Sequence, residues 1–118
     1  MVEKIKSAYI LWHGYHDTFP KTHKYSLGNR IDKAFIELLE GAVTASFLPK
    51  EEKASYIRFA IRKLDLICIL LLVSLETNSL SEKRYLALST PLYEAGKMLG
   101  GWYGQLTKQN SPPISEEK

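Results

Sequence analysis

The sequence predicts an all-α protein folded as an antiparallel up-down four-helix bundle. Apolar residues recur at helical spacing along most of the chain, no stretch alternates as a strand does, and short polar or proline-containing segments separate four helical stretches. With 118 residues, 45% hydrophobic and 25% charged, the composition is that of one globular domain. We expect the bundle to span residues 1–109, and the polar, proline-containing residues 110–118 to form a disordered tail.

The first helix is expected from Glu3 to His16 and ends before Pro20, because proline disfavours helix in the residue that precedes it. The second is expected to start near Ser26, whose side chain is suited to an N-cap. The apolar stripe of the first helix comprises Ile5, Ala8, Tyr9, Trp12 and Tyr15. That of the second comprises Leu27, Ile31, Ala34, Phe35, Leu38, Ala42 and Ala45.

The third helix is predicted to begin with Pro49 in its first position and to continue to Glu76. Its stripe comprises Ile57, Ile61, Leu64, Cys68, Leu71 and Leu75. Ser81 is expected to cap the fourth helix, and Pro91 either kinks that helix or marks a tolerated missing backbone hydrogen bond. The stripe of the fourth helix comprises Tyr85, Leu88, Leu92, Ala95, Leu99, Trp102 and Leu106.

Two features exceed the needs of a monomeric bundle. The third helix is apolar all round after Leu66, and Ile36, Leu39, Val43 and Phe47 add a similar excess to the second. A large intrachain core is one explanation, but an interface in a symmetric homo-oligomer fits better. Glycines spaced four apart on the fourth helix would let another backbone approach closely, except that the helix is expected to fray near Gly104. The predicted interface residues are Leu66, Ile69, Leu70, Val73, Gly96 and Gly100.

The sequence has no evident nucleophile, acid–base pair, metal-ligand set or cofactor-binding loop, so we expect that the protein is not an enzyme and has no cofactor or metal site. His13 and His16 share a helix face, but nothing nearby completes a ligand set. Cys68 lies in the most apolar stretch, where a thiol stays protonated and inert. The start lacks the apolar segment of a signal peptide and the longest apolar run, Leu66 to Val73, is too short to span a membrane, which predicts a cytoplasmic protein.

Basic residues interleave with aromatic ones around the turn between the first two helices, where Phe19, His23 and Tyr25 accompany the cations. A second basic group lies on the third helix. A solvated face with salt bridges would explain both, but such side chains also bind phosphates without sequence preference, and rings among them stack on unpaired bases. The net charge is +3. The candidate nucleic-acid-binding residues are Lys21, Lys24, Arg30, Arg58, Arg62 and Lys63.

The segment Phe19 to Ile31, which reads Phe-Pro-Lys-Thr-His-Lys-Tyr-Ser-Leu-Gly-Asn-Arg-Ile, resembles a segment of the accessory variability determinant (Avd) proteins of diversity-generating retroelements. The stretch Glu94 to Trp102 is similar to the end of that family's fourth helix. The resemblance covers roughly residues 5 to 106. Lys24 stands where that family usually has arginine, and Ala95 replaces a bulkier residue.

The resemblance implies a homopentamer of four-helix bundles that binds RNA or DNA and the element's reverse transcriptase, supporting mutagenic cDNA synthesis. It places Lys21, Lys24 and Arg30 on basic positions of the family's first motif, whereas Arg58 and Arg62 match only the basic character of its third helix. The bundle proteins encoded within 23S ribosomal RNA genes share the Phe-Pro opening and stay an alternative. A scaffolding bundle that binds only protein is another.

Overall fold

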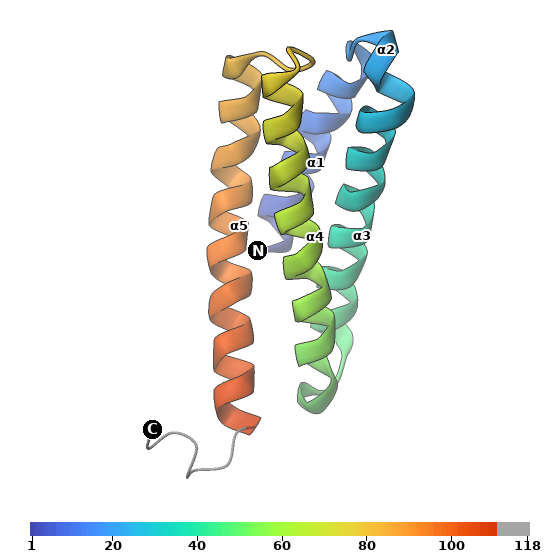
Figure 1. Cartoon of the computed structure of the whole chain (residues 1–118). Coiled ribbons are helices and arrows are strands. Elements are labelled where there is room, and N and C mark those ends of the chain that lie inside the picture. Colours follow the sequence, from blue (N-terminus) through green and yellow to red (C-terminus); the bar gives the residue numbers. More distant parts are fainter. Residues whose placement is uncertain (111–118) are drawn as a thin grey trace.

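The computed structural model describes residues 1–110 as six helical segments (Figure 1). No strand occurs in this part of the chain, so the all-α prediction is confirmed. The predicted tail lies outside the described residues except for Asn110, which is the last residue of a helix. The segments are α1 (Val2–Asp17), α2 (Lys21–His23), the π-helix η1 (Lys24–Gly28), α3 (Asn29–Phe47), α4 (Lys50–Glu76) and α5 (Glu82–Asn110).

The four long helices form an antiparallel bundle in which α1 and α4 each pack against both α3 and α5. At 1.5 Å per residue, α1 is about 24 Å long and α5 about 44 Å. The bundle therefore has four helices only along the half that contains the α1–α3 connection, and α3, α4 and α5 continue alone beyond the N-terminus of α1 (Figure 1).

One continuous core runs through the bundle. Trp12, Phe35, Leu64 and Leu99 are all buried, as the apolar stripes predict. The stripe of α5 is also in the predicted phase, with Leu88, Leu92 and Leu106 buried. The stripe of α4 is shifted by comparison, because its buried positions are Ile57, Ala60, Leu64, Ile67, Leu71 and Ser74.

The placement of Cys68 in that stripe was wrong: the residue is exposed at the rim of a groove between α4 and α5. Because every residue in this run is apolar, hydropathy alone does not show which of them faces the core. In the structure Ile67 is buried and Cys68 is not. The thiol is still poorly suited to ionise. Partial desolvation, and then the negative charge of Asp65, raise the pKa of the Cys68 thiol.

The predicted start of the second helix was also wrong, since helical structure begins at Lys21 and not at Ser26. Pro20 is extended, with φ −55° and ψ 134°, and its carbonyl accepts hydrogen bonds from the backbone N–H groups of His23 at 2.9 Å and Lys24 at 2.8 Å. The chain continues through η1 into α3 without a break. Ser26 lies inside η1, so it is not an N-cap.

The later helix boundaries lie close to the predicted ones. Pro49 is the N-cap of α4 rather than its first residue, while the Ser81 hydroxyl accepts from the backbone N–H of Arg84 at 3.3 Å, as an N-cap does. The α5 helix runs through Pro91. It also continues past Gly104, so the expected fraying there was wrong. A single glycine costs only about 1 kcal/mol of helix propensity, which the contacts of Leu106 with the core offset.

The connections at the α1–α3 end are tied together by side chains. The guanidinium of Arg84 lies 4.6 Å from the centre of the Tyr15 ring and donates to Thr18 Oγ1 at 2.7 Å, which links α5 to the end of α1. Asn78 adopts a left-handed conformation with φ 60° in the α4–α5 turn. The following backbone N–H groups of Ser79 and Leu80 both donate to the Ser74 carbonyl, at 2.8 and 3.1 Å.

Candidate nucleic-acid interface

The turn segment Phe19–Gly28 serves mainly to close the bundle. Phe19 is buried, with its ring 5.7 Å from that of Trp12, so it is unavailable for stacking on a base and this part of the prediction was wrong. His16 stacks on Trp12 at 5.3 Å. A Cβ on Gly28 would lie 3.0 Å from Cδ2 of His16, so a larger residue here would require the His16 ring to shift. Phe19, although it is close to basic residues in the sequence, is therefore a core residue.

His23 also has a structural contact, because its Nδ1 is hydrogen bonded to the Ser79 hydroxyl of the α4–α5 turn. Lys21 is exposed and Lys24 is half-buried, and neither forms an ion pair within the described part of the chain. Tyr25 between them is 78% exposed. The turn segment thus offers two cations and one ring to solvent at the end of the bundle.

Arg30 and Lys63 are brought together by one carboxylate. Glu37 Oε1 lies 3.8 Å from Nη1 of Arg30 and 3.3 Å from Nζ of Lys63. The Lys63 ammonium also lies 5.2 Å from the centre of the Phe59 ring. These two cations are therefore partly neutralised within the chain, which lowers their capacity to bind phosphate.

Arg58 and Arg62 lie one turn apart on α4, and both are exposed. Within residues 1–108 neither has an acidic partner. Lys21 and Lys24 belong to α2 and η1 at the end of the bundle, so they are separated from the two arginines on α4 (Figure 1). The structure therefore divides the six candidates into three groups: an end pair, a Glu37-bound pair and an exposed α4 pair.

The predicted excess of apolar residues on α4 lies only partly at the surface, because Leu66 and Leu70 pack against the core. Ile69 is 59% exposed, Val73 is also exposed, and Leu66 and Leu70 are half-buried. The glycines differ from one another. A Cβ on Gly96 would lie 2.9 Å from Cδ2 of Leu64, so this glycine permits close packing inside the chain, whereas Gly100 faces open space.

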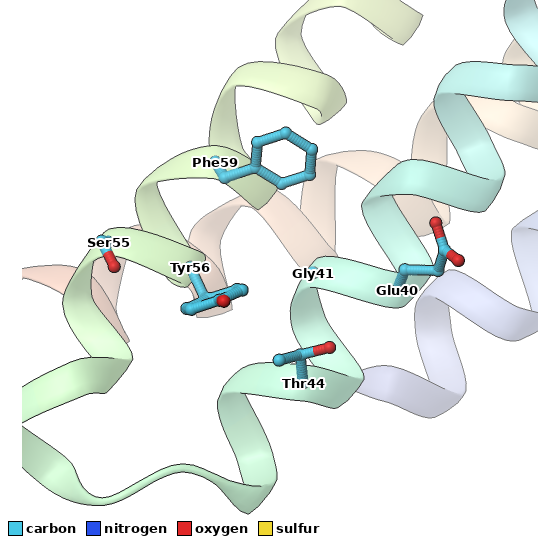
Figure 2. Close-up of a pocket in the computed structure, with 6 residues that line it drawn as sticks. All are labelled: Glu40, Gly41, Thr44, Ser55, Tyr56 and Phe59. Carbon is cyan, nitrogen blue, oxygen red and sulfur yellow. The ribbon is translucent and has the colours of Figure 1, made fainter.

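A groove between α3 and α4 was missed at the sequence level. This Tyr56–Phe59 groove has a volume of about 240 Å³. Figure 2 shows the rings of Tyr56 and Phe59 on α4 and, opposite them, Gly41 on α3. A second hollow of about 360 Å³ adjoins it at Phe59. The signal available was the spacing of Tyr56, Phe59 and Arg62 on one helix face. The groove is lined by Glu40, Gly41, Thr44, Ser55, Tyr56 and Phe59, and the hollow by Phe59, Arg62, Lys63 and Leu66.

Asp32 holds a hydrogen-bond network between α1 and α3. Asp32 Oδ1 accepts hydrogen bonds from Tyr9 Oη at 3.0 Å and from Trp12 Nε1 at 3.2 Å. Burial, followed by the hydrogen bond and the negative charge of Asp32, raises the pKa of the Tyr9 phenol. This carboxylate fixes α1 against α3.

Within the described residues, no three His, Cys, Asp or Glu side chains are grouped as a metal site. None of the described helices combines the length and hydropathy needed to cross a bilayer. Comparison with known proteins gives no match to a family profile, a curated protein or a solved structure.

Proposed function

We propose that this protein is a non-enzymatic, nucleic-acid-binding accessory subunit of a retroelement reverse transcriptase that supports mutagenic cDNA synthesis. One observation carries the nucleic-acid part: Lys21, Lys24, Arg58 and Arg62 form no ion pair within the described residues, so their charges are available to phosphates. The polymerase partner rests on the resemblance of the turn segment to the Avd proteins.

The proposal includes a symmetric homo-oligomer, for which the resemblance indicates five subunits. Exposed apolar residues on α4 support it, since Ile69 and Val73 would be covered by a neighbouring copy. Repeating the cations around a symmetric assembly would also strengthen a weak basic field and make binding multivalent.

The oligomer is tested by introducing one charge at two equally exposed positions. Ile69→Glu should dissociate the assembly while leaving helicity intact, because a buried unpaired charge opposes association. Ile10→Glu on α1 is the matched control, since Ile10 is 63% exposed and Ile69 is 59% exposed. Mass in solution is the measurement. A monomeric wild-type protein at micromolar concentration, or equal behaviour of both variants, would contradict this interface.

The function is tested by two assays on the whole protein. Affinity for RNA and for DNA should fall steeply with salt and depend little on sequence. The yield of cDNA from the element's own template and reverse transcriptase should rise when the protein is added. A protein-only scaffold predicts no salt-sensitive binding, while binding without any change in cDNA yield would contradict the role with a reverse transcriptase.

A further inference from the structure

We propose that the Tyr56–Phe59 groove is a base-stacking subsite for single-stranded nucleic acid and that Arg62, beside it, holds the backbone phosphate. The proposal rests on the nucleic-acid-binding function above and specifies the form of ligand bound. It concerns a different surface from the turn segment, where Phe19 is buried in the core.

The groove provides two accessible rings. Tyr56 is 42% exposed and Phe59 is 37% exposed, and their spacing of three residues places them on the same face of α4. Gly41 forms the facing wall on α3 (Figure 2). A Cβ there would lie 3.0 Å from Cδ2 of Phe59, so glycine lets the Phe59 ring pack closely against α3, and a base would stack on the exposed parts of the Tyr56 and Phe59 rings. Stacking on such rings tolerates any base, because every base has a π-face.

The charges around the groove give the ligand an orientation. Arg62 and Lys63 line the hollow on the far side of Phe59, and Arg62 has no acidic partner in the described chain. Glu40 stands at the opposite side, in the Tyr56–Phe59 groove. Its carboxylate repels phosphate but accepts hydrogen bonds from the exocyclic amino groups of bases. The base therefore enters on the Glu40 side, and the phosphate lies against Arg62.

This arrangement selects an unpaired strand. In a duplex the faces of the bases are already stacked on one another, so the rings of Tyr56 and Phe59 would have no partner. A duplex would still meet the cations through its phosphates. Removing the rings should therefore change single-strand binding while leaving duplex binding as it was.

The experiment compares a fluorescein-labelled single strand of RNA with the same strand annealed to its complement, by fluorescence anisotropy. Tyr56→Leu and Phe59→Leu remove a ring but retain an apolar side chain. Each should weaken single-strand binding by about tenfold or more and leave duplex binding unchanged. Tyr93→Leu is the matched control, because Tyr93 is a 69% exposed ring on α5 outside the groove, and it should change neither affinity.

The outcomes separate this inference from the proposed function. Wild-type single-strand affinity in both groove variants, with salt-sensitive binding retained, would overturn the subsite alone. No salt-sensitive binding by the wild-type protein would overturn both proposals. A change in the mass of the assembly in either groove variant would show that the groove is a protein interface, and would also overturn the subsite. The ratio of single-strand to duplex affinity is the readout, because a misfolded variant would lose both.

Discussion

Two regions of the molecule combine aromatic and basic residues, and the structure uses them differently. In the turn segment, Phe19 packs on Trp12, Gly28 accommodates His16 and His23 is hydrogen bonded across to Ser79. On α4, the rings of Tyr56 and Phe59 face a groove, and the neighbouring Arg58 and Arg62 form no ion pair within the described residues. An interleaved pattern in the sequence therefore does not distinguish a bundle-closing turn from a binding surface. Burial of the ring does distinguish them, because Phe19 is buried whereas Tyr56 and Phe59 are exposed.

The largest expected contrast within the turn segment is between its two aromatic rings. Phe19→Ala should lower the free energy of unfolding by about 3–5 kcal/mol, because it removes a buried ring from the core. Tyr25→Ala should change it by less than about 0.5 kcal/mol, because that side chain is mostly exposed. Urea unfolding followed by circular dichroism measures both. A similar loss of unfolding free energy in the two variants would contradict the assignment of Phe19 to the core and of Tyr25 to the surface.

The Asp32 network gives the next largest effect. Asp32→Ala should cost about 1–3 kcal/mol, because it leaves the Tyr9 hydroxyl and the Trp12 indole N–H without their acceptor. The same unfolding measurement tests this. An unchanged free energy of unfolding would mean that water satisfies both donors and that the carboxylate does not fix α1 on α3.

The pH dependence of stability follows from Tyr9. Its pKa is raised in the folded protein, so as pH rises past about 10 the unfolded chain loses this proton first. The stability that Tyr9 contributes is therefore complete below pH 10 and is lost as pH rises through the folded pKa. The difference in unfolding free energy between the wild type and Tyr9→Phe should shrink over that range. A difference that stays constant with pH would contradict the raised pKa.

The smallest effects concern two glycines of α5. Gly100→Ala should stabilise the protein by up to about 1 kcal/mol, because alanine favours helix and the added methyl meets open space. Gly96→Ala should gain less, or destabilise, because its methyl would displace Leu64. Thermal unfolding of the two variants gives the comparison. A destabilised Gly100→Ala variant with unchanged oligomer mass would contradict the open environment of Gly100.

The fold followed from the sequence wherever one face of a helix is buried. The stripe of α5 and the core positions of Phe35 and Trp12 needed only helical periodicity. The phase of α4 could not be found in this way, because from Leu66 onward both its faces are apolar, and Cys68 was misplaced as a result. Pro20 precedes helical structure just as Pro49 does, but it was interpreted only as a break. The π-helix η1, which joins α2 to α3, has no distinct sequence pattern.

The candidate site was only partly predictable for a related reason. Charge in the sequence identified Arg58 and Arg62, but it could not show that Glu37 pairs with both Arg30 and Lys63, since Lys63 lies on another helix and reaches Glu37 only through the packing of α3 on α4. The Tyr56–Phe59 groove depends on the register between α3 and α4, which places Gly41 opposite Phe59. Contacts of this kind are set by tertiary packing.

The salt dependence of RNA binding tests the central claim, that the exposed cations of α4 bind phosphate, most directly. For a single strand, each neutralised phosphate contributes about 0.7 to the slope of log affinity against log salt. Arg58→Gln/Arg62→Gln should therefore lower affinity and reduce the slope by about 1.4 if each arginine meets one phosphate. Lys6→Gln/Lys83→Gln removes the same charge from exposed positions on α1 and α5, and should leave the slope near that of the wild type. An unchanged slope in the arginine variant, or an equal reduction in the lysine variant, would contradict the assignment.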